Sequence, residues 1–234
     1  MSISSSLPST LRVLFLAAEA APLIKVGGLG DVAGSLPHAL SVIPAHLLEG
    51  RTLDMRLVIP YHGEVARKLL DPQPVASFIV QHPSGPIPTR AFVTYLSDIP
   101  VYMIEGAPIG TEAPVYSGDN YLDGLKYAFF SLAAVELARQ LDWQPDIVHA
   151  NDWHTALSVF HLARRRLSRD AFFARTRSVL TIHNLPFMGA GAERALDEFG
   201  IQPVKDLRLP VWARQFPLPL GLLAADRIVA VSPT

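Results

Sequence analysis

Short apolar runs alternate with longer segments of helical periodicity along most of this chain, and this alternation constrains the fold more than any other feature. The runs at residues 12–18, 54–60, 147–150, 178–182 and 227–231 have the length and composition of buried strands. Successive parallel strands need crossover helices, and those crossovers are right-handed. We therefore predict an α/β fold with a Rossmann-like, doubly wound and mainly parallel sheet, covered by helices on both faces.

Residues 75–104 depart from this alternation. Three short β-like runs occur there, at 75–80, 90–95 and 101–104, and turns rich in Pro and Gly separate them. This spacing predicts a small antiparallel excursion from the main sheet.

Helices are predicted between the strands. Asp31 is placed to cap a helix that continues to about residue 48. Apolar positions near helical spacing predict a long helix over 121–141, whose aromatic stripe packs in the core. Further helices are expected at 155–167, 193–199 and 218–225.

Composition limits the class of protein. With 234 residues, of which 50% are hydrophobic, residues 11–234 suit one large domain, and the Ser-rich residues 1–10 are predicted to be a flexible tail without a signal peptide. A net charge of -1 provides no long-range field for nucleic acid or anionic membranes, so neither partner is expected. Without cysteines, the cytoplasm is the default location.

The mean hydropathy of +0.27 leaves two interpretations open. The excess of apolar residues belongs either to fully buried parallel strands or to a surface that faces another domain. The chain also stops directly after the run at 227–231, where a functional loop is expected to begin, so we read the sequence as truncated.

A glycine-dense turn, Lys-Val-Gly-Gly-Leu-Gly-Asp at residues 25–31, joins the first strand to the first helix. Glycine lets the backbone lie against a ligand, and helix-initial amides carry partial positive charge, so Lys25, Gly27, Gly28 and Asp31 are candidate ligands of an anion. The alternative is that the glycines only allow a tight connection between the strand and the helix and bind no ligand. The pattern is neither Gly-x-Gly-x-x-Gly nor a Walker sequence, so it assigns neither NAD nor ATP.

Polar residues also follow two other predicted strands. Asp152 and His154 come after the strand at 147–150, and His183 and Asn184 come after the strand at 178–182. The alternative for the first segment is that Asn151 or Asp152 caps the following helix. The alternative for the second is that His183 is an ordinary buried, hydrogen-bonded histidine. Because ligands bind outside the carboxyl ends of parallel strands, we expect one site, with Asp152 contacting substrate hydroxyls.

Other kinds of site are disfavoured. The histidines do not have the spacing of metal ligands, so no metal is predicted. No Gly-x-Ser-x-Gly motif is present, and the basic run at 164–166 is interpreted as a solvated helix end.

Four segments together, at 25–32, 149–157, 181–185 and 225–234, resemble bacterial glycogen synthases and plant starch synthases. The resemblance spans almost the whole chain. It implies the N-terminal half of a GT-B glycosyltransferase that moves glucose from ADP-glucose or UDP-glucose to the non-reducing end of an α-1,4-glucan. Configuration is retained and no metal or other cofactor is required.

The resemblance also implies residue roles. Lys25 matches a lysine near the donor phosphates, and the backbone at Gly27 and Gly28 approaches them. Asp152 matches an active-site aspartate, and His183 matches a histidine that contacts the transferred glucose. Tyr116 resembles a tyrosine that lines the cleft.

Departures from the family pattern lead to further expectations. The C-terminal donor-binding domain is absent, so we expect little or no transferase activity from this chain alone. Lys126 stands where arginine is common, and residues 209–223 differ from the usual sequence. The alternatives are a non-catalytic glucan-binding or regulatory module and a GT-B transferase with a different acceptor.

Overall fold

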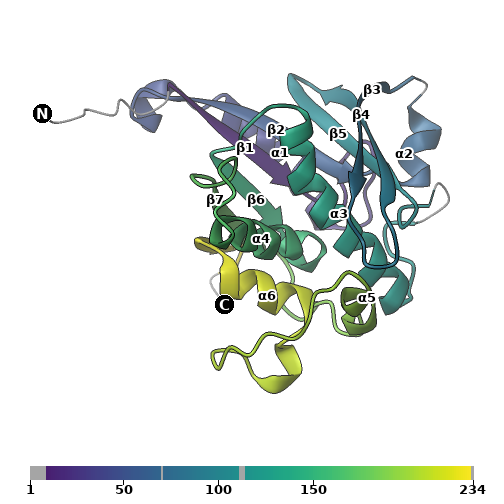
Figure 1. Cartoon of the computed structure of the whole chain (residues 1–234). Coiled ribbons are helices and arrows are strands. Elements are labelled where there is room, and N and C mark those ends of the chain that lie inside the picture. Colours follow the sequence, from purple (N-terminus) through teal and green to yellow (C-terminus); the bar gives the residue numbers. More distant parts are fainter. Residues whose placement is uncertain (1–8, 70, 111–113, 233–234) are drawn as a thin grey trace, which may run out of the picture.

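The computed structural model describes residues 9–69, 71–110 and 114–232, and its centre is an eight-stranded sheet with the order β3-β4-β5-β2-β1-β6-β7-β8 (Figure 1). Strands β5, β2, β1, β6, β7 and β8 pair in parallel, whereas β3, β4 and β5 pair antiparallel. The strands are β1 (Thr10–Leu16), β2 (Thr52–Pro60), β3 (Gln73–Val80), β4 (Ile87–Leu96), β5 (Ile99–Gly106), β6 (Ile147–Asn151), β7 (Arg177–Ile182) and β8 (Arg227–Ala230). The predicted α/β class and the antiparallel excursion are confirmed.

Helices connect the parallel strands. The strand order reverses at β1, so right-handed crossovers place α1 on the opposite face of the sheet from α3 and α4, which pack against each other. The helices are α1 (Gly28–Ser41), α2 (Gly63–Lys68), α3 (Asn120–Gln140), α4 (Asp152–Leu167), α5 (Glu193–Glu198) and α6 (Pro217–Ala224), with 3-10 turns at Ala45–Leu48 and Val211–Ala213. Within the described ranges, none of these helices is long and apolar enough to cross a membrane.

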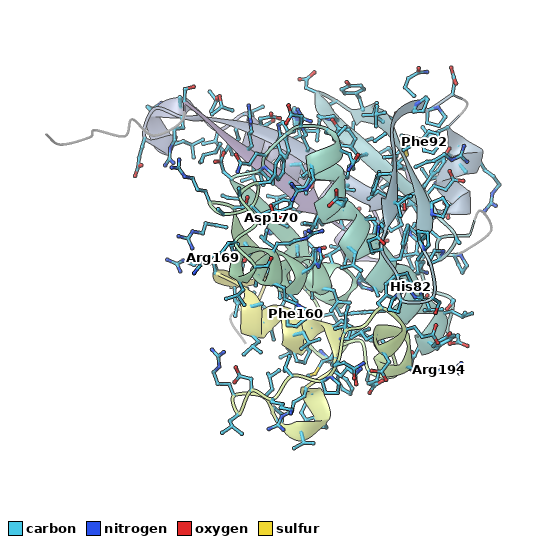
Figure 2. All side chains as sticks on the ribbon, in the orientation of Figure 1. His82, Phe92, Phe160, Arg169, Asp170 and Arg194 are labelled. Atoms are coloured by element: carbon cyan, nitrogen blue, oxygen red, sulfur yellow. The ribbon has the colours of Figure 1, made fainter. Side chains whose placement is uncertain are left out.

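The core lies between the sheet and these helices, and side chains fill that space (Figure 2). Phe15 of β1 is fully buried, as are Phe129 and Phe130 of α3, so the aromatic stripe packs in the core as predicted. At the far end of the β3–β4 hairpin, the ring of His82 meets the ring of Phe199 edge-on, with centroids 4.6 Å apart. The hairpin is thereby packed against the end of α5.

Edge strand β8 differs from the other predicted strands because all four of its residues are exposed. Ile228 and Val229 are 52% and 46% exposed. Part of the high mean hydropathy therefore comes from surface residues, and part from buried ones such as residues 13–16 of β1. Buried strands account for one of the two interpretations left open by the sequence, and whether exposed β8 faces another domain stays a prediction.

The first helix is shorter than predicted. It begins at Gly28 with Gly27 as its N-cap residue, so Asp31 lies in the first turn and does not cap the helix. It ends at Ser41, and a separate 3-10 turn follows Pro44. α1 accommodates Pro37 in its interior, but the backbone of Pro44 is extended, with ψ of 136°, so one helix does not extend to residue 48.

The basic run at the end of α4 is also not simply solvated. Arg166 Nη1 donates to Asp226 Oδ2 at 2.7 Å and to the Thr176 carbonyl at 3.2 Å. Asp226 accepts as well from the backbone and hydroxyl of Ser178. The expectation was wrong for Arg166, because partners distant in sequence join α4 to the start of β8. Residues 1–8 of the predicted tail lie outside the described residues, and β1 begins at Thr10.

Candidate active site at the carboxyl edge of the sheet

Three polar segments leave the sheet at neighbouring strand ends. In the register of the sheet, Leu16 of β1 lies beside Ala150 of β6, and Asn151 of β6 lies beside Thr181 of β7. The strand order reverses at β1, the position at which open α/β sheets bind ligands. The segments following β1, β6 and β7 therefore emerge at one edge, as the sequence predicts.

Asn151 links these three strand ends. It is fully buried, and its side-chain amide donates to the carbonyl of Leu16 at 2.9 Å. Its Oδ1 atom then accepts from His183 Nε2, also at 2.9 Å. Asn151 occupies the N-cap position of α4, but its side chain makes no capping bond. The capping interpretation of this residue was therefore wrong, because the side chain bonds to neighbouring strands instead.

This contact determines which nitrogen of His183 is available. Since Nε2 donates to Asn151, the neutral ring presents Nδ1 as an acceptor. Burial lowers the pKa of His183, and the negative charge of Asp152 partly offsets that shift. The ring is therefore neutral near pH 7 and can accept a hydrogen bond from a hydroxyl group.

Asp152 shapes the loop that carries His183. The backbone of Asp152 has φ of 56°, in the left-handed region, which costs a non-glycine residue about 1–2 kcal/mol. Its side chain is buried, and Oδ1 accepts from the backbone amides of His183 at 2.7 Å and Asn184 at 3.2 Å. Asp152 thus holds the post-β7 loop in place, while the Asn184 side chain lies on the exposed surface.

The glycine turn holds a carboxylate from within the chain. Glu19 is fully buried after β1, and it accepts hydrogen bonds from the backbone amides of Val26 and Gly27. Lys25 forms an ion pair with Asp31 at 2.8 Å, and both side chains are more than half exposed. Glu19 thus occupies the amides of Val26 and Gly27, which precede the first residue of α1, Gly28. The helix-initial amides are other groups, so their role as anion ligands stays a prediction.

Close packing holds the segment between β1 and the glycine turn against α1. A Cβ atom on Gly34 would lie 2.2 Å from the carbonyl oxygen of Ala21, a distance that no side chain tolerates. Glycine is therefore required at this position. A Cβ atom on Gly28 would meet nothing within 4 Å, so packing alone does not explain that glycine.

Tyr116 lies between the glycine turn and the end of β6. Burial raises its pKa, and the carboxylates of Glu19, Asp152 and Asp123 raise it further, so the hydroxyl stays protonated. The ring is 37% exposed, and its centroid lies 5.3 Å from that of His154. Tyr116 can therefore present a donor and an apolar face at the site.

His154 is buried behind Tyr116. Its ring packs against Tyr127 and Trp153, at centroid distances of 4.7 and 4.3 Å. Burial lowers its pKa to about 3, and the charges of Lys126 and His62 add to the shift. Neither ring nitrogen has a hydrogen-bond partner among the residues that the structure describes. The structure places this candidate beneath the site surface.

A cavity of about 250 Å³ lies beside the glycine turn, with Tyr116 in its wall. It is large enough for a sugar ring and combines apolar and charged walls. Its lining residues are Ile24, Val26, Glu64, Arg67, Pro114, Val115 and Tyr116. Across the described ranges, no group of three His, Cys, Asp or Glu side chains is arranged to hold a metal ion.

Glu19 was not among the candidates from the sequence, and Asn151 was considered as a helix cap or a polar residue at this edge, but not as a site residue. Glu19 follows a strand directly, as Asp152 and His183 do, so its position was an available signal. The bonds of Asn151 to β1 and to the loop after β7 span 135 and 32 residues of sequence, and no local pattern indicates them.

The fold matches a solved enzyme domain. The catalytic domain of starch synthase IV from Arabidopsis thaliana has a TM-score of 0.77 and 24% sequence identity, covering 97% of this chain and 46% of that chain. The architecture is therefore one half of a GT-B fold, the class of many glycosyltransferases. The model of the starch synthase catalytic domain matches residues 12–234, so the chain belongs to that family of glycosyltransferases.

Bacterial glycogen synthases are similar in sequence. The enzyme of Vibrio parahaemolyticus serotype O3:K6 is 38% identical over 233 residues, which cover 97% of this chain and 45% of the relative. That of Vibrio vulnificus strain YJ016 is 37% identical over 230 residues, with coverage of 96% and 45%. The chain thus spans less than half the length of the curated relatives it matches.

Proposed function

We propose that this chain supplies the N-terminal half of a site that transfers glucose from ADP-glucose or UDP-glucose to the non-reducing end of an α-1,4-glucan, with retention of configuration. The observation that carries the proposal is the joining of three strand ends by Asn151, which leaves Nδ1 of His183 free to accept a sugar hydroxyl. The Arabidopsis thaliana starch synthase IV domain was solved bound to ADP and acarbose. A nucleotide and an oligosaccharide are therefore suitable ligands for a fold of this kind.

The residues at the edge take complementary parts in this proposal. His183 orients the glucose to be transferred, and Asp152 holds the loop that carries His183 and Asn184. Tyr116 presents its hydroxyl and ring to the sugar, with His154 packed behind it. These contacts favour reaction by positioning the substrate and by complementing its hydroxyl groups.

The phosphates would lie nearest the glycine turn. Lys25 is the exposed cation there, and the backbone at Gly27 and Gly28 lies beside it. Lys25 is paired with Asp31, so a phosphate would have to compete with that carboxylate. Exposed pairs of this kind contribute at most about 1 kcal/mol, so a diphosphate can displace the carboxylate.

We propose that the remaining half of the enzyme supplies most of the charge that stabilises the departing diphosphate. With Glu19 and Asp31 close to the turn, this half alone has no excess of positive charge. Transfer requires that charge in the transition state, so the chain alone should have little transferase activity. The test is incorporation of radiolabelled glucose from ADP-glucose and UDP-glucose into glycogen, and turnover typical of a complete synthase would refute the proposal.

The same neutralised turn favours a second candidate, a glucan-binding module without transferase activity. Titration of the chain with maltoheptaose and with ADP-glucose separates the two functions. Binding of both ligands, each weakened by His183→Ala and unaffected by exposed His46→Ala, supports a donor and acceptor site. Binding of maltoheptaose alone supports the module.

A further inference from the structure

The segment that carries Tyr116 is held to α3 by a buried lysine. Lys126 Nζ donates to the carbonyls of Pro114 at 2.9 Å and Val115 at 2.7 Å, and it also pairs with Asp123 Oδ1 at 2.8 Å. Lys126 is only 2% exposed. All three donors of the ammonium group are therefore used within the protein, and two of them hold the backbone immediately before Tyr116.

Two further side chains of α3 hold the same segment. The backbone amide of Ser117 donates to both carboxylate oxygens of Asp123 at 3.1 Å, and the Tyr127 hydroxyl donates to the Val115 carbonyl at 2.6 Å. Asp123, Lys126 and Tyr127 are separated by three and four positions, so they lie on one face of the helix. The backbone on both sides of Tyr116 is thus bonded to α3.

This arrangement is costly for the fold, because a buried ion pair must recover the hydration that both charges lose. Burial also lowers the pKa of Lys126, while the bond to Asp123 opposes that change. An apolar residue would pack at this position without that penalty, but it could not bind two carbonyl oxygens. The polar side chains therefore specify where the segment lies, a role documented for some buried polar groups.

The segment is also part of the candidate site. Pro114, Val115 and Tyr116 form one wall of the 250 Å³ cavity, and Val26 of the glycine turn forms part of the rest. The Tyr116 ring rests on the buried ring of His154. A shift of the backbone at Val115 would move the Tyr116 ring relative to both the cavity and His154.

We propose that Lys126, Asp123 and Tyr127 are positioning residues that hold Tyr116 against the cavity and so set the affinity of the site for an α-1,4-glucan. They do this without touching the sugar themselves. The inference rests on the proposed function for its ligand, but its geometric content, the placement of Tyr116 by α3, can be tested independently of any ligand.

The first experiment measures the dissociation constant of maltoheptaose by calorimetry for matched variants of α3. Tyr127→Phe removes only the hydroxyl that bonds Val115. Tyr121→Phe makes the same change on the same helix, where the hydroxyl donates instead to Glu198 at 2.8 Å. We expect binding about tenfold weaker for Tyr127→Phe, the effect of misplacing one or two hydrogen bonds, and an unchanged constant for Tyr121→Phe. Equal effects of the two substitutions would overturn the proposal.

Lys126 gives a stronger perturbation with its own rescue. Lys126→Met should weaken binding at least as much as Tyr127→Phe, and Lys126→Arg, which keeps charge and donors, should restore it to within about threefold. In a Tyr116→Ala background, Tyr127→Phe should have no further effect, because the positioning residues act through Tyr116. Additive losses in that double variant would refute the mechanism. If Lys126→Met does not fold, the Tyr127 comparison decides alone.

A spectroscopic measurement separates this inference from the proposed function. Fluorine resonances of 3-fluorotyrosine-labelled protein are recorded without ligand, and the Tyr116 signal is assigned with Tyr116→Phe. Tyr127→Phe should shift or broaden that signal, whereas Tyr121→Phe should leave it unchanged. If maltoheptaose does not bind the unmodified chain, the proposed glucan function fails, and the Tyr116 signal then upholds or overturns the positioning role alone.

Discussion

Acid should destabilise the fold through two buried neutral histidines. Burial is the main cause that lowers the pKa of His154 to about 3 and that of His62 to about 4. His62 Nε2 contacts the carbonyl of Ala18 at 3.0 Å, and that bond only partly offsets the shift. Histidine in the unfolded chain has a pKa near 6.5. Between about pH 6.5 and pH 4, the unfolded state therefore binds more protons than the folded state.

The sign and size of the effect follow from this difference. Stability contributed by a group with a depressed folded pKa is present above its unfolded pKa and is lost as the pH falls toward the folded value. Lowering the pH from 7 to 5 should cost about 2 kcal/mol for each of His62 and His154, or about 4 kcal/mol together. A domain is typically stable by about 5–15 kcal/mol, so this loss is readily measured.

Urea unfolding at pH 7 and pH 5 tests the reasoning. His154→Phe keeps a flat ring between Tyr127 and Trp153 but cannot bind a proton, so its loss of stability between the two pH values should be about 2 kcal/mol smaller than for the unmodified chain. His46→Phe, at an exposed position, is the control. If His154→Phe and the unmodified chain lose the same stability, His154 is not a buried neutral histidine and the reasoning is wrong.

Three further perturbations have defined outcomes. Gly34→Ala, which places a Cβ atom 2.2 Å from the Ala21 carbonyl, should lower the free energy of unfolding in urea by about 1–3 kcal/mol, and an unchanged midpoint would contradict the packing argument. Glu19→Gln turns an acceptor of two turn amides into a group with one acceptor, so urea unfolding should show a loss of about 1–3 kcal/mol, against no loss for exposed Glu49→Gln. Asp152→Ala releases the loop carrying His183, so calorimetry should show about tenfold weaker binding of maltoheptaose, whereas unaltered affinity would argue against that positioning role.

The sequence predicts the sheet well because its central strands are buried on both faces and therefore read as continuous apolar runs. The run at 227–231 has the same composition, yet β8 is exposed, since composition does not indicate which strand lies at an edge. The helix α2 was not predicted, because Gly63–Lys68 is too short to show a period. The end of α1 at Ser41 was also missed. Apolar residues continue at helical spacing beyond it, and the prediction followed this spacing past Pro44.

The site is predictable to the level of strand ends, but not to the level of contacts. Polar residues after apolar runs indicate that Asp152 and His183 lie at the carboxyl edge, as the structure shows. That Glu19 fills the glycine turn depends on a bond to amides seven and eight residues away through a loop of particular shape. The burial of His154 depends on packing against Tyr116, Tyr127 and Trp153, and the position of Tyr116 involves hydrogen bonds between α3 and residues 114–117 that no local pattern indicates.

The link made by Asn151 has a consequence for protein engineering. One amide side chain joins the carbonyl of Leu16 to the ring of His183, across the strand between them. A change of the loop after β7 that removes His183 would leave Oδ1 of Asn151 without its donor, and a shift of the Asn151 side chain would disturb the end of β1 as well. Altered sugar specificity is therefore more safely sought in the cavity wall at Val26 and Glu64, where residues can be exchanged without disconnecting neighbouring strands.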